Sequence, residues 1–183
     1  MLSRSLGIIV LIILSPLLFV VSGIIFLDDG FPILFKQKRI GFRNRVFFVY
    51  KFRTMRNGIP DVPTHLLKAK DTLFTRSGSI LRKLSIDELP QLLNILKGEM
   101  FFVGPRPALY NQEDLITLRT KVGVHMLLPG ITGWAQVNGR DELSIEQKVT
   151  YDEYYLNNRS LRMNLKIIIM TVLKVLKMHS VSH

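Results

Sequence analysis

The pair Asp87-Glu88 stands out as a candidate for chemistry, because cationic residues flank it on both sides. It lies within "LRKLSIDELPQLLNILKGEMFFVGPRP", residues 81–107, with Arg82 before it and Arg106 after it in a loop stiffened by two prolines. Arginine suits bidentate contact with phosphate, and a carboxylate can attack phosphorus, move a proton or hold a metal. The free N–H groups of a helix start also attract phosphate. Together these groups indicate phosphoryl transfer.

An ordinary structural explanation of the same residues stays open. Ser85 and Glu88 have the spacing of a capping box, in which each side chain satisfies a backbone N–H at a helix start. Acidic residues in a first helical turn also complement the helix dipole. Spacing alone does not decide between cap and chemistry. A glycosidase is a poorer explanation, because adjacent carboxyls beside phosphate-type cations do not resemble a pair that flanks a sugar ring.

The composition suits a membrane-associated protein with an anionic partner. The chain has 183 residues, a formal net charge of +11 and 48% hydrophobic residues, which fits one domain with a real core. It has no cysteine, so disulfides and thiolate chemistry are excluded, and its four histidines lack metal-ligand spacing. No nucleic-acid-binding motif is recognisable, so nucleic acid is not expected as a partner.

The first thirty residues predict a membrane segment. Leu6 to Leu27 is a run of 22 residues without a charge, and a helix of that length would reach ~33 Å, enough to cross a hydrocarbon core of ~30 Å. The run is too long for a signal peptide, and no A-x-A-like site follows it. Ser15-Pro16 near its middle predicts a break or kink, with the Ser15 hydroxyl satisfying a freed carbonyl. A kinked spanning helix and a re-entrant helix both remain open on physical grounds.

A basic hairpin is expected next. Phe31 to Pro60 holds eight Lys or Arg and no acid, with β-formers and a turn at Ile40-Gly41. This basic surface either is simply solvated or contacts lipid phosphate or a nucleotide. After residues 89–96, whose leucines have helical spacing, Gly98 predicts a helix end.

The second half of the chain predicts two longer helices. A short buried extended piece and the rigid "GPRP" loop come first, and Ser144-x-x-Gln147 opens a helix through a capping box. The last helix carries an apolar face that can lie in a membrane interface or pack on the core. Its residues are Leu165, Ile168, Ile169, Val172 and Leu176.

The sequence resembles the bacterial sugar transferase family, the monotopic phosphoglycosyl transferases. The matching stretches are "KFRTM", "LRKLSIDELPQLLNILKGEM", "FVGPRP", "PGITGWAQVNGR" and "YDEYYLNN", which cover nearly the whole chain in order. The resemblance is to the minimal form, without an extra multi-span N-terminal region. It implies an α+β, mostly helical fold. Residues 1–30 would form a re-entrant membrane helix broken at Ser15-Pro16, and residues 31–183 a small cytosolic catalytic domain with a short β-hairpin and interfacial amphipathic helices.

The resemblance also implies a reaction and its residues. Family members transfer a sugar-1-phosphate from a UDP-sugar to undecaprenyl phosphate and release UMP. Asp87 would be the nucleophile, forming a phosphosugar-aspartyl intermediate, and would lie at a Mg²⁺ ion, while Glu88 would assist proton handling. The residues expected to bind substrate are Lys51, Arg53, Arg82, Arg106, Gln136 and Arg140.

The expected setting is the cytoplasmic face of the bacterial inner membrane, at the first membrane step of glycan assembly. Expected partners are the UDP-sugar, undecaprenyl phosphate, the membrane and downstream glycosyltransferases. The sequence names neither the sugar nor the glycan pathway, and Asp141 and Asn164 depart from the family pattern and receive no role. The alternative from another functional class is a membrane-anchored basic binding module without catalysis.

Overall fold

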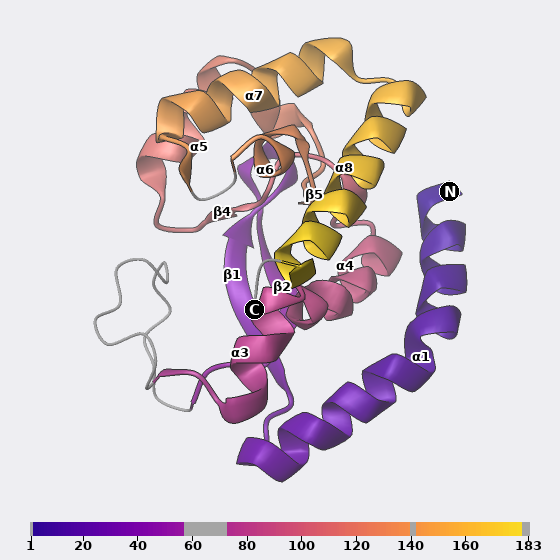
Figure 1. Cartoon of the computed structure of the whole chain (residues 1–183). Coiled ribbons are helices and arrows are strands. Elements are labelled where there is room, and N and C mark those ends of the chain that lie inside the picture. Colours follow the sequence, from indigo (N-terminus) through magenta and orange to yellow (C-terminus); the bar gives the residue numbers. More distant parts are fainter. Residues whose placement is uncertain (1, 57–72, 140–141, 181–183) are drawn as a thin grey trace.

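The first helix, α1 (Leu2–Asp29), continues through Pro16 and is bent along its length (Figure 1). The computed structural model describes residues 2–56, 73–139 and 142–180. Pro16 has no N–H for the carbonyl of Ile12, and the Ser15 Oγ donates to that carbonyl instead at 2.7 Å. The expected break is therefore a bend within a continuous helix, with the freed carbonyl satisfied as predicted.

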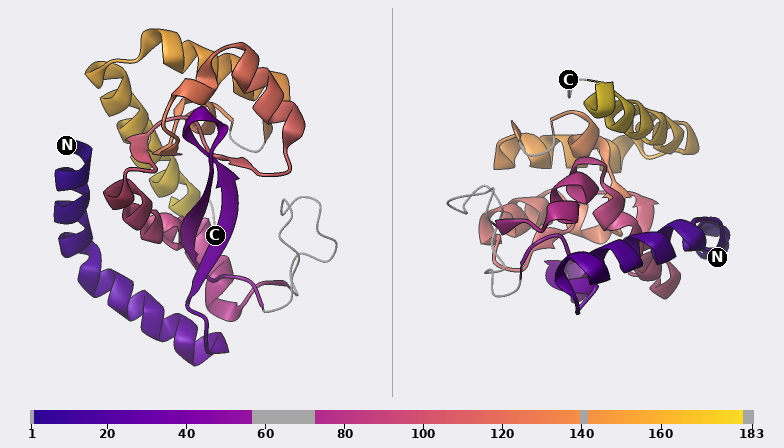
Figure 2. Two further views of the ribbon diagram at one scale, coloured as in Figure 1. Left: turned by 180° about the vertical axis from the view of Figure 1, so that it is seen from behind. Right: turned by 60° about the horizontal axis from the view of Figure 1, so that its bottom comes forward.

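The outward side of α1 is apolar and exposed. By length and composition it is long and apolar enough to cross a membrane, and only 11% of its most apolar window is buried. Phe19 is 82% exposed and Leu27 is 85% exposed, whereas Val21 and Ile25 on the inward side pack against the rest of the chain. Figure 2 shows the helix curving along the outside of the molecule.

The predicted hairpin is present and has its turn at the predicted place. Strands β1 (Leu34–Ile40) and β2 (Val46–Phe52) pair antiparallel and are joined through the 3-10 turn η1 (Phe42–Asn44). The short strand β4 (Ala108–Leu109) extends this sheet on the β1 side. Lys51 pairs with Phe35 and Val49 pairs with Gln37 in the register. Because side chains alternate along a strand, Gln37, Arg39 and Lys51 share one face of the hairpin.

The segment around the carboxylate pair differs from the expected capped helix. It consists of α3 (Arg76–Lys83), the 3-10 helix η3 (Ile86–Gln91) with Pro90 inside it, and α4 (Leu92–Lys97). Ser85 adopts a left-handed conformation with φ +56°, and its side chain makes no cap hydrogen bond. The capping box that the spacing left open does not form, because the Glu88 side chain is held by two cations instead of the backbone. Gly98 ends α4 at φ +78°, as predicted.

The remaining elements form the other side of the molecule. Strand β3 (Phe101–Val103) pairs parallel with β5 (Gly130–Thr132). Between them lie α5 (Glu113–Lys121) and η4 (Val124–Met126), and α6 (Trp134–Val137) follows β5. Helix α7 (Ile145–Asn158) starts with the predicted capping box, both halves of which form.

The last helix, α8 (Leu161–Ser180), does not pack on the core with the apolar face identified from the sequence. Ile167 is fully buried, and Met163 and Met170 pack beside it. The predicted apolar face is exposed at all four of its described side chains, namely Leu165, Ile168, Ile169 and Val172. The helix therefore has one apolar face on the core and a second apolar face exposed.

Candidate active site

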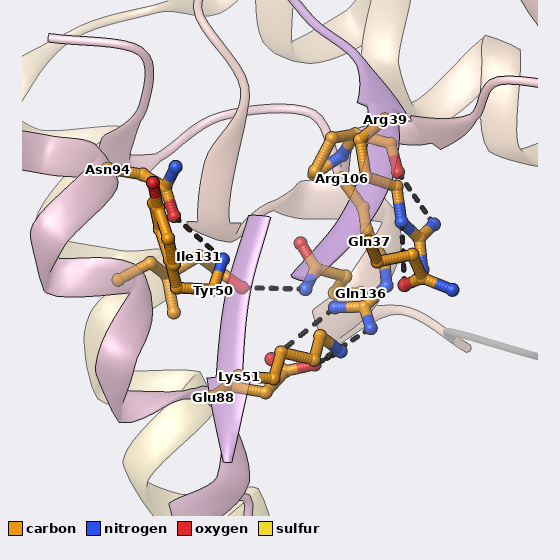
Figure 3. Close-up of polar contacts among 10 residues, drawn as sticks. Gln37, Arg39, Tyr50, Lys51, Glu88, Asn94, Arg106, Ile131 and Gln136 are labelled. Atoms are coloured by element: carbon orange, nitrogen blue, oxygen red, sulfur yellow. Dashed lines mark hydrogen bonds and ion pairs between the residues drawn. The ribbon is translucent and has the colours of Figure 1, made fainter. Parts of the chain in front are cut away.

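Glu88 is fixed by two cationic side chains from different parts of the chain (Figure 3). Its Oε1 lies 2.8 Å from Lys51 Nζ on β2 and 2.8 Å from Arg106 Nη2 in the loop after β3. Arg106 Nη1 also donates to Oε2 at 3.4 Å. The Glu88 side chain is only 9% exposed, so these contacts are shielded from solvent and geometrically constrained. Glu88, whose spacing from Ser85 would also fit a helix cap, is therefore the centre of an ionic network.

The two neighbouring carboxyls have opposite pKa shifts. Burial would raise the pKa of Glu88, but Arg106 and Lys51 outweigh burial and hold that pKa well below its ordinary 4.5. Burial raises the pKa of Asp87, the Lys51 ammonium opposes this, and the Glu88 carboxylate adds to the rise. Burial also lowers the pKa of the Lys51 ammonium, although Glu88 partly offsets this effect. Two adjacent acids thus have different electrostatic environments, a pattern found at sites that move protons or charge.

The backbone of the Arg106 loop is held by two further arginines. Arg119 on α5 donates to the carbonyl of Arg106 at 2.8 Å, and Arg39 on β1 donates to the carbonyl of Pro107 at 3.1 Å. Arg119 is itself paired with Asp152 of α7, which is 1% exposed. Consecutive carbonyls on the loop are thereby fixed, so Arg106 presents its guanidinium to Glu88 from a rigid backbone.

The inward face of the hairpin adds polar groups that sequence reasoning did not single out. Arg39 Nε donates to Gln37 Oε1 at 3.0 Å, and the positive charge of Arg39 contributes to the field at Lys51. Gln37 is 9% exposed. The signal was present in the sequence, because Lys51 and the predicted turn place these two side chains on the same hairpin face.

Two other residues that the sequence predicts to bind substrate, Arg82 and Gln136, have contacts of their own in the structure. The Arg82 guanidinium sits 4.9 Å from the centre of the Phe74 ring and contributes positive charge at Asp87. Gln136 on α6 donates its amide to the carbonyl of Ile131 at 2.9 Å. Its Oε1 is buried and has no hydrogen-bond partner in the described part of the chain.

Two predicted substrate-binding residues are not brought into this cluster by the described structure. Arg53 is buried, and its guanidinium pairs with Asp29 at the end of α1. Arg140 lies outside the described residues, as does Asp141. Asn164, which received no role, accepts a hydrogen bond from the Tyr155 hydroxyl at 2.8 Å.

The charge balance of the cluster favours an anionic ligand. Three cationic side chains, Lys51, Arg82 and Arg106, act on the two carboxylates, and Arg39 adds positive charge at Lys51. An excess of positive charge in a partly buried site attracts phosphate. The described residues contain no cluster of three or more His, Cys, Asp or Glu that could hold a metal. A divalent cation here would need oxygen atoms from the ligand in addition to Asp87, which is how Mg²⁺ commonly binds beside phosphates.

Comparisons with known proteins agree on one family. A family model described as bacterial sugar transferase matches residues 1–178. An uncharacterized sugar transferase, EpsL of Bacillus subtilis, is 45% identical over 162 residues, which cover 88% of this chain and 79% of that protein. Two longer relatives are matched over about a third of their length.

The first longer relative is the undecaprenyl-phosphate glucose phosphotransferase of Komagataeibacter xylinus, 41% identical, with 91% of this chain and 33% of that protein covered. The second is the UDP-glucose:undecaprenyl-phosphate glucose-1-phosphate transferase of Xanthomonas campestris, 39% identical, with 94% of this chain and 37% of that protein covered.

Proposed function

Because the chain belongs to the bacterial sugar transferase family, we propose that it transfers a sugar-1-phosphate from a UDP-sugar to undecaprenyl phosphate and releases UMP. The observation that supports this best is the buried Glu88 network beside Asp87, with Lys51 and Arg106 fixed at 2.8 Å. Such an arrangement combines a nucleophile with immobile cations that neutralise phosphate charge.

The reaction proceeds in two displacements at the sugar-bearing phosphorus. In the first, an Asp87 carboxylate oxygen forms a bond to that phosphorus, and the bond from the phosphorus to the bridging oxygen breaks. UMP leaves with the electron pair, and a phosphosugar-aspartyl intermediate remains. In the second, an oxygen of undecaprenyl phosphate forms a bond to the same phosphorus and the aspartyl bond breaks, which regenerates Asp87. Splitting the transfer in this way means that the donor and the lipid need not be bound together.

Glu88 takes its catalytic role only after the substrate arrives. In the unliganded protein its low pKa makes it a weak base, because Lys51 and Arg106 stabilise its ionised form. A diphosphate bound to those cations would compete for their positive charge and weaken their hold on the carboxylate. Glu88 would then accept a proton from the lipid phosphate more readily. Lys51 and Arg106 thereby serve as phosphate ligands in the complex.

Asp87 is also the residue expected to hold Mg²⁺, together with oxygen atoms of the donor diphosphate. The carboxylate chemistry fits, because Mg²⁺ accepts one or two carboxylates when phosphates complete its shell. The ion would supply charge neutralisation at the diphosphate. The positive charges of Arg82 and Arg106 both lower the pKa of Asp87 and so favour its ionised, nucleophilic form.

The membrane arrangement proposed is a re-entrant α1 with both ends at the cytoplasmic face of the inner membrane. The amino end of α1 contacts α4, where Arg4 Nη2 lies 3.4 Å from the Lys97 carbonyl, and Gly7 packs against Leu96. The carboxyl end contacts α3 and the end of β2 through Asp28 and Asp29. One compact body on one side of a bilayer can hold both ends only if the helix returns to that side.

The exposed apolar face of α8 supports an interfacial placement of this helix. Its flanking cations include Lys166, which lies 5.0 Å from the centre of the Trp134 ring. A helix with an apolar face and basic flanks binds at the boundary of acyl chains and headgroups. The catalytic domain, residues 31–183, would then keep its site near the phosphate of the lipid acceptor. The lipid-linked sugar diphosphate would pass to a downstream glycosyltransferase.

The deciding experiment is UMP release by purified protein with Mg²⁺, with and without undecaprenyl phosphate, over a panel of UDP-sugars headed by UDP-glucose. Lipid-dependent UMP from the wild type, abolished in Asp87→Asn with unchanged membrane fraction and melting temperature, is the expected result. Full activity of Asp87→Asn would refute the nucleophile. Salt-sensitive binding of anions without UMP release from any donor would favour the binding-module alternative.

A further inference from the structure

The carboxyl end of α1 carries an unfavourable pair of charges. Its last turn contains Asp28 and Asp29 and no basic residue. The unpaired carbonyls of a helix end carry partial negative charge, so two carboxylates at this position are repelled by the helix itself. Contacts with the rest of the chain must offset that repulsion. These contacts lead directly toward the candidate active site.

Asp28 acts as a cap for a helix that it does not belong to. Its Oδ2 accepts hydrogen bonds from the backbone N–H of Ser77 at 2.7 Å and from the Ser77 Oγ at 2.6 Å. Ser77 lies in the first turn of α3, where backbone N–H groups lack partners within the helix. The membrane helix thus terminates on the amino end of α3.

Asp29 holds the end of β2 through Arg53. Arg53 Nη2 lies 3.0 Å from the Asp29 carboxylate, 2.6 Å from the Asp29 carbonyl and 2.9 Å from the Gly30 carbonyl. Arg53 is only 5% exposed, so its charge is committed to the terminus of α1. Arg53 thus donates to the Asp29 and Gly30 carbonyls and forms an ion pair with the Asp29 carboxylate.

Of the two held elements, β2 carries a site residue and α3 leads into the segment that carries the two carboxylates. Lys51, which contacts Glu88, stands two residues before Arg53 on β2, and α3 ends at Lys83, four residues before Asp87. The elements also meet each other closely. Thr75 N–H donates to the Thr54 carbonyl at 3.1 Å.

Close packing leaves little room for slippage at this junction. A Cβ placed on Gly78 would lie 2.1 Å from the Thr54 carbonyl oxygen. Beneath it, an apolar cluster joins the same three elements through Val21 and Ile25 of α1, Phe52 of β2 and Leu81 of α3. A shift at the end of α1 would therefore be transmitted to β2 and α3.

We propose that Asp28 and Asp29 are positioning residues for the transfer reaction. Through Ser77 they fix α3, which precedes the Asp87 segment η3, and through Arg53 they fix the end of β2, which carries Lys51. The catalytic rate therefore depends on how the end of the membrane helix is seated. The inference rests on the proposed function, because its measure is the rate of sugar-phosphate transfer. A misplacement of about 1 Å at a reacting group can cost on the order of a hundredfold in rate.

The test is steady-state UMP release by the full chain in detergent, with a UDP-sugar that the wild type uses. The double variant Asp28→Ala/Asp29→Ala is expected to lower kcat at least about tenfold, with the donor KM changed by less than about twofold. Assays well below each variant's melting temperature exclude loss through unfolding. The matched control is Asp114→Ala, which removes an exposed acid from the first turn of α5 and is expected to leave kcat unchanged.

Single substitutions separate a positioning role from a role in substrate binding. Asp29→Glu, which keeps the charge, is expected to regain most of the lost kcat relative to Asp29→Ala. If the double variant fails to fold, Ser77→Ala and Arg53→Lys decide, each with an expected fall of about threefold in kcat at constant KM. A wild-type kcat in these variants overturns the inference, and so does a loss confined to KM, which would make Arg53 a substrate ligand. A wild type that releases no UMP refutes the proposed function instead.

Discussion

Replacement of Glu88 by glutamine tests the central network, because it removes one charge and keeps the shape. Lys51 and Arg106 then remain close together without their carboxylate. Loss of one partner of a fully buried ion pair costs roughly 3–5 kcal/mol. The exposed fractions of 16% for Lys51 and 28% for Arg106 allow partial screening by water. We therefore expect a loss of roughly 2–3 kcal/mol in the free energy of unfolding.

The assay is thermal unfolding in detergent as a function of pH. For a chain of this length, roughly 2–3 kcal/mol corresponds to a decrease of about 5–10 °C in melting temperature. The folded-state pKa of Glu88 is lower than its ordinary 4.5. Its ionised form therefore stabilises the fold at every pH above ~4.5, and this contribution is lost as the pH falls through the lower, folded-state pKa. The gap between wild type and Glu88→Gln is expected to be largest near neutral pH and to narrow in acid.

The control is Glu113→Gln, which removes an exposed acid from the first turn of α5. It is expected to stay within about 0.5 kcal/mol of wild type, as surface substitutions usually do. The reasoning fails if Glu88→Gln and the control have the same melting temperature at neutral pH. It also fails if the gap persists unchanged below the ordinary pKa of a glutamate, since the carboxylate would then not be its source.

The other predictions concern topology, the metal and the guanidinium. Cysteines at Ser3 and Lys36 are expected to react with a membrane-impermeant reagent from the same side of the membrane, and labelling from opposite sides would mean a spanning helix. Chelation of divalent cations is expected to abolish UMP release and added Mg²⁺ to restore it, whereas full activity after chelation would argue against a metal at Asp87. Arg106→Lys keeps the charge but loses the contact of two guanidinium nitrogens with the Glu88 carboxylate. We expect at least about a tenfold loss in kcat/KM, and wild-type kinetics would show that this two-nitrogen contact is unimportant.

Local patterns in the sequence predicted the elements well where the pattern itself supplies the stabilising contact. The hairpin follows from β-formers around Ile40-Gly41, and α4 ends at Gly98 because glycine tolerates a positive φ. The capping box of α7 formed as predicted, since Ser144 and Gln147 find their partners in the same turn. Each of these features needs no residue from elsewhere in the chain.

Features that depend on distant partners could not be predicted from spacing. Ser85 and Glu88 have capping-box spacing too, but Lys51 lies 37 residues away and its ammonium is a stronger partner for the carboxylate than a backbone N–H. Arg53 lies in the "KFRTM" stretch, which predicts a substrate contact, and no spacing signal points to its ion pair with Asp29, 24 residues earlier. Likewise, no local signal joined Arg119 to Asp152, 33 residues apart.

The contacts at the two ends of α1 have a consequence for how the protein is made. Lys97 lies 93 residues after Arg4, and Ser77 lies 49 residues after Asp28. At a synthesis rate of about 5–20 residues per second, the segment around Lys97, which contacts the amino end of α1, is synthesised roughly 5–20 s after that end. During this interval the helix lacks these protein partners, so the proposed membrane placement would let it meet lipid first. With α1 placed in the membrane as proposed, insertion would precede docking, and the rest of the chain would assemble against a helix that is already embedded.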